Sequence, residues 1–156
     1  MLVSDKIKNV TTSEDFLFWA CNVGRNGICD MARVSGFIVE EDNEHITFFL
    51  PEKFFDYMKV NLLPEANISL LMVSVMNFES YQVKGNYISH KYCSEENNDF
   101  YRLRILKSID IITDLGLNGK GILGFLLEQP GIAVTFRCRE SYLQTPKPGT
   151  GTKLTD

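Results

Sequence analysis

The stretch FWACNVGRNGICDMARVSGFIVEEDNEHITFFLP, from Phe18 to Pro51, decides the fold. Its first apolar run ends at a Gly-Arg-Asn-Gly turn, and a second apolar run starts at Ile28. An Asn-Gly pair between two such runs is the strongest short-range signal of a β-hairpin. We therefore expect two antiparallel strands, over 16–23 and 28–39.

The residues after this hairpin predict a third strand and a helix. A polar turn over 40–44 leads into His45–Leu50, which is rich in β-branched and aromatic residues. Pro51 follows where a helix can begin, because its φ is already set for a first turn. Apolar residues with helical spacing then predict a helix over about 52–62.

The rest of the chain adds three strands and two helices. We expect the strands over 67–76, 79–90 and 131–143, and the helices over 100–115 and 122–128. The first connections are too short for parallel crossovers, so the six strands favour an antiparallel barrel. The predicted fold is mainly β with α: one domain over 1–156, with flanking short helices and an extended C-terminal arm over 146–156.

Composition excludes several classes of protein. A chain of 156 residues with 44% hydrophobic and 23% charged residues is typical of one globular domain. The net charge is −4 and basic residues never cluster, so we expect no nucleic-acid partner. No segment is apolar enough for a membrane span. The four cysteines lack any C-x-x-C spacing, which favours free thiols in the cytoplasm.

Most catalytic motifs find little support. Gly119–Gly124 reads G-x-G-x-x-G, the pattern of a dinucleotide-binding loop, but that loop must follow a strand, and the residues before it have helical spacing. A helix connection made of small residues is the favoured interpretation. The histidines, His45 and His90, lack the spacing of a zinc site, and no G-x-S-x-G elbow is present. Hydrolytic triads and mononuclear metal sites are therefore disfavoured.

A set of polar and basic residues in strands predicts a ligand site. Gln82 and Lys84 share one face of a strand, and Arg33 belongs to another strand. Lys53 and Lys59 lie in the expected short helix. Such groups beside a barrel could bind a phosphate through charge-assisted hydrogen bonds. Basic residues that serve only solubility are the plainer alternative.

The order of several motifs resembles that of a known family. The stretch quoted above, then NLLPEANISLLM (61–72) and ESYQVKG (79–85), resembles the pyridoxamine 5′-phosphate oxidase-like family of FMN-binding split barrels. The ending YLQTPKPGTG (142–151) is similar to an F-x-Q-T-P-G-P-G-x-G pattern in one branch of that family. The resemblance covers the chain from about Phe16 to Gly151.

This resemblance implies a six-stranded split barrel that forms a homodimer with two FMN sites at the subunit interface. The family's usual phosphate-binding lysine is replaced here by Met58, which leaves Lys53 and Lys59 as the candidates for the phosphate. The implied cofactor-binding residues come from two strands and a strand end, from the helix, and from a later strand that reaches the flavin across the dimer: Arg33, Val34, Phe49, Leu50, Pro51, Lys53, Lys59, Gln82 and Lys84. Phe54 and Phe55 are expected at the interface or beside the flavin.

The implied function is that of an FMN-dependent oxidoreductase acting on a small redox substrate. True pyridoxamine 5′-phosphate oxidases have a further C-terminal segment with Arg and His residues, which is missing after Arg139. The alternative is a non-catalytic split barrel with a degenerate flavin site that binds a deazaflavin, a haem or another small ligand.

Overall fold

The structure, a computed structural model, describes residues 2–24 and 26–155. The strands are β1 (Phe16–Val23), β2 (Cys29–Val34), β3 (Gly36–Val39), β4 (His45–Pro51), β5 (Asn67–Ser74), β6 (Ser80–Tyr92) and β7 (Gly131–Leu143). The helices are α1 (Asp5–Val10), α2 (Glu52–Met58), α3 (Glu95–Asp114) and α4 (Gly119–Leu123), with 3-10 turns η1 (Lys59–Asn61) and η2 (Gly124–Leu127).

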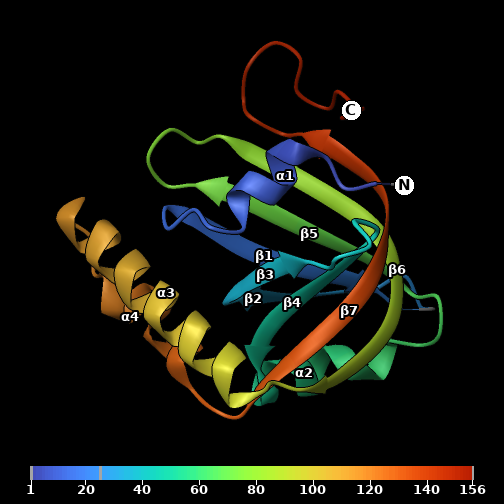
Figure 1. The fold of residues 1–156 in the computed structure, drawn as a ribbon, viewed down its shortest axis with the longest axis horizontal. Helices are drawn as coiled ribbons and strands as arrows, with labels where there is room; N and C mark the ends of the chain where they lie inside the picture. Colours follow the sequence, from blue (N-terminus) through green and yellow to red (C-terminus); the bar gives the residue numbers. More distant parts are fainter. Residues whose placement is uncertain (1, 25, 156) are drawn as a thin grey trace.

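The strands form one antiparallel sheet that curls into a split barrel (Figure 1). Their order is β2-β1-β5-β6-β7-β4-β3, so the two outermost strands are consecutive pieces of the chain, separated by Ser35. The Ser35 N–H donates to the Phe49 carbonyl at 2.7 Å. The expected strand over 28–39 therefore divides in two, because it leaves β1 and pairs with β4; the sheet has seven strands where six were expected.

The barrel core is made by alternate residues of the strands. In β7 the side chains of Ile132, Val134, Phe136 and Cys138 are at most 3% exposed, which confirms the alternation expected there. Phe18 of β1 meets Phe37 of β3 edge-to-face across the barrel, with ring centroids 5.5 Å apart. Burying one such aromatic side chain stabilises the fold by roughly 1.5–3 kcal/mol, so these strands supply much of the stability.

Helix α3 covers the outer surface of β3, β4 and β7 on one flank of the barrel (Figure 1). The Tyr101 ring stacks on Phe49 with centroids 4.0 Å apart. It also lies against Gly36, where a Cβ atom would come within 2.6 Å of the ring, so this close approach needs glycine. The helix begins at Glu95, earlier than expected, because the Ser94 hydroxyl accepts the Asn97 N–H at 3.2 Å.

The G-x-G-x-x-G sequence forms α4 and the start of η2, after α3 and a turn. The Asn118 side chain accepts the Gly121 N–H at 2.9 Å and so caps α4. Leu123 and Leu126 pack with Ile105 and Ile112 of α3 in a second apolar cluster. The interpretation as a helix connection is confirmed, because the segment before these glycines is helical.

The two ends of the described chain differ from expectation. Helix α1, which the sequence pattern did not predict, is capped by the Ser4 hydroxyl and buries Ile7. The C-terminal tail folds back along β7 instead of extending away, since the Gly151 N–H donates to the Leu143 carbonyl at 2.7 Å and Leu154 packs against the barrel core. This return lies at the top of Figure 1, near the start of the chain.

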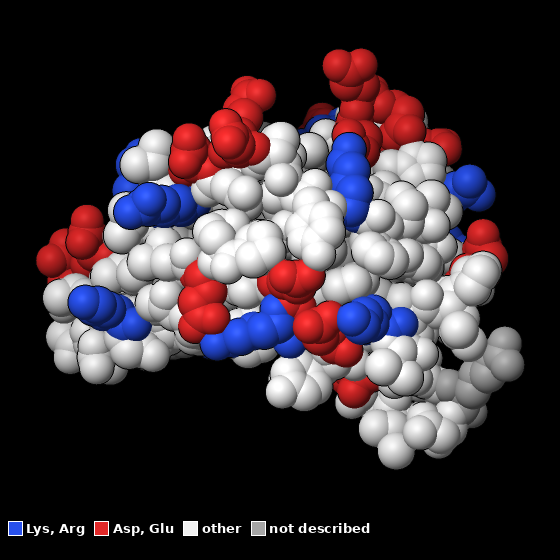
Figure 2. Space-filling view, turned by 90° about the horizontal axis from the view of Figure 1, so that it is seen from below, with Lys and Arg blue, Asp and Glu red and all other residues white. Residues whose placement is uncertain are grey.

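Charged side chains of both signs are mixed on the surface. Figure 2 shows Lys and Arg beside Asp and Glu at several places on one face, with uncharged residues between them. Exposed ion pairs of this kind include Lys53 with Glu128 at 2.6 Å and Lys107 with Glu14 at 2.5 Å. The face in Figure 2 therefore presents no continuous field of one sign.

Candidate functional site

A row of large side chains crosses the outer face of the sheet, starting at the edge strand β2 beside α3 and α4. Strand register places Trp19 beside Arg33 on one side and Leu71 on the other. Leu71 pairs with Gln82, and Gln82 pairs with Tyr142. All five are half-buried. We call these five residues the outer-face row.

Arg33 brings a buried cationic group to this row. Its guanidinium lies 4.5 Å from the centroid of the Trp19 ring. Burial lowers the pKa of Arg33, but an arginine remains charged at neutral pH. Its Nη1 is buried and has no hydrogen-bond partner within residues 2–24 and 26–155. Leu123 and Leu126 line the same closed gap as Arg33, so an anionic oxygen would reach this unpaired cationic donor only after the gap opens.

Hydrogen bonds of side-chain amides hold Gln82 in place at the other end of the row. Gln82 Nε2 donates to the Ser69 hydroxyl at 2.8 Å, and Gln144 Nε2 donates to Gln82 Oε1 at 3.0 Å. Lys84, one step along the same face of β6, holds its ammonium 4.9 Å from the centroid of the Tyr142 ring. These contacts orient an amide and a cation toward the same side of the sheet.

A hollow of about 290 Å³ adjoins the row. Its lining includes Cys21, Asn67, Ser69, Lys84 and Arg139. Arg139 donates to the Asn67 side chain at 2.9 Å. The hollow lies beside a bulge between Lys84 and Gly85, where the register of β6 and β7 shifts. Two cations and several polar groups around one hollow favour an anionic ligand.

Four of the residues expected to contact the flavin have side chains that are closed to a ligand. Val34 and Leu50 are about 1% exposed and belong to the barrel core. Phe49 lies on the opposite face of β4 but is covered by Tyr101. Pro51 is buried where β4 ends. At the end of β4, only backbone groups therefore remain available to contact a cofactor.

The helix residues expected at the phosphate do not converge. The ammonium groups of Lys53 and Lys59 form ion pairs with Glu128 at 2.6 Å and with Asp56 at 2.5 Å. Met58, at the position of the family's lysine, is 1% exposed and packs in the core. Three of the nine expected residues, Arg33, Gln82 and Lys84, therefore share a face.

Phe54 and Phe55, expected at the interface or beside the flavin, pack against other parts of this chain, Phe55 buried and Phe54 half-buried. Phe55 is 4% exposed and belongs to the barrel core. Phe54 meets the Phe125 ring of η2 edge-to-face, with centroids 5.2 Å apart. The first turn of α2 thus fixes the helix against the barrel and against η2.

Trp19, Tyr142 and Arg139 are the site residues that sequence reasoning did not single out. The signal available in the sequence was the alternation of inward and outward side chains along a strand, which repeats every two residues. Trp19 alternates with the core residues Phe18 and Ala20, so it must point outward. The same pattern places Arg139 outside β7, but it would place Tyr142 inside; Tyr142 faces outward because Arg139 is an extra residue between the pairs Gly85–Cys138 and Lys84–Glu140, which the sequence pattern does not show.

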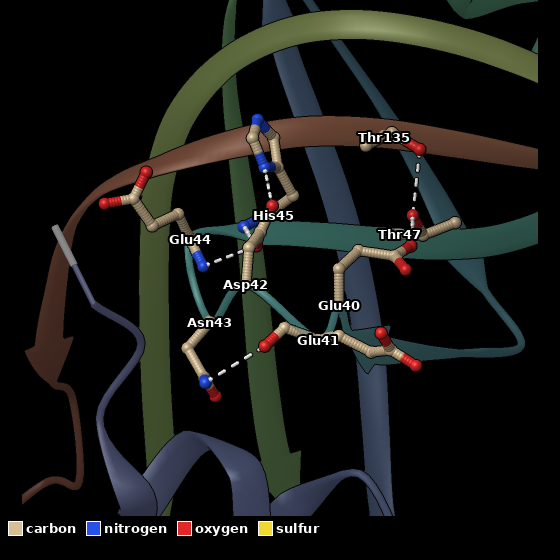
Figure 3. A network of polar contacts seen from close by, with 8 residues as sticks. All are labelled: Glu40, Glu41, Asp42, Asn43, Glu44, His45, Thr47 and Thr135. Atoms are coloured by element: carbon tan, nitrogen blue, oxygen red, sulfur yellow. Dashed lines mark hydrogen bonds and ion pairs between the residues drawn. The ribbon is translucent and has the colours of Figure 1, made fainter.

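A second polar cluster lies at the turn between β3 and β4 (Figure 3). The Asp42 carboxylate accepts the Glu44 N–H at 2.8 Å and the His45 N–H at 3.0 Å, and it contacts His45 Nδ1 at 2.6 Å. These hydrogen bonds lower the pKa of Asp42 to about 2. The Thr47 hydroxyl bonds to Glu40 and lies 2.8 Å from the Thr135 hydroxyl. The cluster ties the turn to its strands, which is a structural role.

Comparisons with known proteins bear on the fold. No model of a known protein family matches the chain, and no curated protein matches it. HupZ of Group A Streptococcus superposes with a TM-score of 0.55 at 9% identity, over 97% of this chain and 99% of that chain. An FMN-binding protein from Syntrophomonas wolfei gives 0.54 at 12% identity, over 87% and 80%. A Lactobacillus delbrueckii protein named provisionally as a pyridoxamine 5′-phosphate oxidase gives 0.51 at 10%, over 90% and 93%.

At these identities the matches establish the fold, which is the split barrel of the pyridoxamine 5′-phosphate oxidase-like proteins.

Within the described part of the chain, no helix is long and apolar enough to cross a bilayer. In the same residues, His, Cys, Asp and Glu side chains form no group of three or more that could hold a metal ion.

Proposed function

We propose that the protein binds FMN on the outer face of its sheet and works in the cytoplasm as an oxidoreductase on a small molecule. The outer-face row is the observation that supports this most. It carries the unpaired Arg33 donor, the Trp19 ring and the Gln82 amide on one face of the split barrel. Bound FMN would supply hydride transfer, and the protein would supply binding, orientation and charge.

Each residue of the row has a distinct part in this proposal. Arg33 would bind an anionic oxygen of the cofactor through its unpaired Nη1, once the gap around it opens. Gln82 is held by Ser69 and Gln144 and offers an oriented amide for hydrogen bonding. Lys84 carries a positive charge that stabilises an anionic reduced ring. The hollow lined by Lys84 and Arg139 leaves room beside these groups for part of the ligand.

The phosphate is the part of FMN that the chain fits least well. With Met58 in the core, the cations near the strand end are Lys53 and Lys59, each in an ion pair at the surface. Exposed ion pairs are weak. Lys53 can therefore leave Glu128 and pair with a phosphate at little cost in free energy. Arg139, which lines the hollow on the sheet face, is a further candidate cation for the phosphate.

We also propose that two copies associate through this face. Trp19, Leu71 and Tyr142 are apolar or aromatic, lie side by side in register and are only half-buried. A second sheet laid on the row would bury them and close the hollow against water. The cofactor would then lie between the two copies.

An absorption spectrum of the purified protein tests the proposal. A yellow protein, or one that takes up added FMN with quenching of flavin fluorescence, supports it. Arg33→Ala and Gln82→Ala should each weaken uptake about 10-fold or more, since a hydrogen bond to a charged group contributes about 1.5–3 kcal/mol. Arg102→Ala, an exposed change on α3, is the matched control. A protein that stays colourless and ignores FMN contradicts the proposal.

A second function is favoured by a specific observation. The stacking of Tyr101 on Phe49 closes the strand end, and Met58 removes the usual phosphate lysine. Both fit a barrel that has lost FMN and binds a deazaflavin, a haem or another small ligand on the same outer face. A Soret band on haem addition, or uptake of a deazaflavin without uptake of FMN, would distinguish this case.

A further inference from the structure

Three sulfur-containing side chains share the outer face of the β1–β2 hairpin. Cys21 of β1 lies directly opposite Met31 of β2. Cys29 lies two residues before Met31, so both side chains project from the same face of the strand. Since Arg33 and Trp19 occupy the next positions along these strands, the three sulfurs extend the outer-face row toward the hairpin end.

The two thiols are diagonal neighbours on one face of the hairpin. Cys21 faces Met31, and Cys29 lies two residues from Met31 along β2. Both cysteines are free, and Cys21 also makes a weak contact of 3.9 Å from Sγ to the Asn22 carbonyl. A pair of neighbouring thiols on adjacent strands offers two ligands without any change in the backbone.

Met31 completes the group with a flexible third ligand. Its side chain is 70% exposed, so its sulfur is not held by core packing. Methionine is unbranched and rotates readily, and its thioether binds soft metals. Cys29 is also exposed and Cys21 lines the hollow, so an ion can reach the group from solvent.

We propose that Cys21, Cys29 and Met31 form a binding site for a soft monovalent metal ion, Cu(I). Thiolate and thioether ligands select Cu(I) over harder cations. Zinc in structural sites takes four ligands, whereas this face offers three sulfurs. On binding, the two thiols lose their protons, so each Cu(I) bound releases two protons while no electron is transferred. The site adjoins the proposed flavin site, because Cys21 lines the same hollow, but Cu(I) binding by the flavin-free protein can be measured separately.

The test is an anaerobic titration of the reduced full-length protein with Cu(I), against a chromophoric Cu(I) chelator as competitor. We expect one equivalent to bind. Loss of even an outer-shell partner costs about 10–100-fold in metal affinity, so Cys29→Ser and Cys21→Ser should each weaken binding at least about 100-fold. Met31→Leu should weaken it about 10-fold. Because Cys29 is exposed, its variant keeps the fold, which far-ultraviolet circular dichroism checks.

Matched controls come from the same chain. Cys93→Ser removes a thiol beside Gly131, and Met76→Leu removes a methionine that is 59% exposed after β5. Both variants should bind Cu(I) as tightly as the parent protein. The proposal is overturned if Cu(I) is not bound, if Cys29→Ser binds it normally, or if Cys93→Ser loses it equally. Binding that is unchanged in Met31→Leu would exclude the thioether and overturn the three-ligand site.

Discussion

Arg104 joins segments that are far apart in the chain. It is 6% exposed, and its guanidinium donates to the carbonyls of Ser35 at 3.2 Å and Phe16 at 3.3 Å, and to that of Ser13. It also lies 4.4 Å from the centroid of the Phe18 ring. One side chain therefore holds α3 to the start of β1 and to the break between β2 and β3.

Replacing Arg104 tests this role. Arg104→Ala leaves three backbone carbonyls without their donor, so we expect a loss of about 3 kcal/mol or more in the free energy of unfolding. Urea denaturation followed by circular dichroism measures it. The exposed Arg102→Ala on the same helix should stay within about 0.5 kcal/mol of the parent protein. Equal midpoints for the two variants would show that the buried contacts do not hold α3.

Asp42 makes stability depend on pH in acid. Its pKa falls from 3.8 to about 2 because three donors of the β3–β4 turn bond to the ionised form. The unfolded chain therefore takes up this proton first as the pH falls. The stabilisation is complete above about pH 4 and is lost as the pH falls toward 2. In Asp42→Asn, the urea midpoint should fall less steeply over this window, whereas Glu41→Gln, an exposed neighbour in the turn, should keep the parent slope.

At the scale of the element, a bulge in β7, with Arg139 as its extra residue, lets two long strands bend together. The register shifts between Lys84 and Gly85, and a Cβ atom on Gly85 would lie 2.0 Å from the Arg137 carbonyl oxygen. Because the obstacle is backbone, the strands must separate to accept a methyl group.

Gly85→Ala should therefore destabilise the fold by about 1–3 kcal/mol, the usual cost of overpacking. Thermal unfolding gives the comparison. Gly124→Ala is the matched control, since its Cβ atom would meet only the flexible Lys120 side chain, at 3.5 Å. A Gly85 variant as stable as this control would mean that the bulge relaxes freely.

Strands with a regular alternation of apolar and polar residues could be predicted from the sequence, whereas short elements could not. The alternation in β6 and β7 gave both the strands and their outward faces, including Gln82 and Lys84. The break at Ser35 could not be predicted, because both halves are apolar and only closure of the barrel makes the chain change partners. Helix α1 spans six residues, which is too short for a helical period to appear.

At the scale of the whole molecule, the candidate site was predictable only in part for a similar reason. Alternation says that Phe49 faces away from the core, as does Arg33. It does not say that Tyr101 of α3 stacks on Phe49, or that residues of α3 and α4 line the closed gap beside Arg33, because both depend on packing between distant segments. Nor can sequence spacing show that Lys53 is paired with a glutamate 75 positions along the chain.

The proposed dimer is argued from the part of the outer face that is incompletely covered. Helices α3 and α4 pack against one part of this face, and among the described residues Trp19, Leu71 and Tyr142 stay only half-buried. Leu71 lies at the centre of the row, so Leu71→Arg would place a charge where a second sheet must pack, and desolvating an unpaired charge is costly. In sedimentation equilibrium the parent protein should show twice the chain mass of 17.8 kDa, and Leu71→Arg should show one chain. Met76→Arg, at an exposed turn, should remain a dimer. A monomeric parent protein would remove the partner that the proposed flavin site needs, whereas a Leu71→Arg dimer would move the interface to another face.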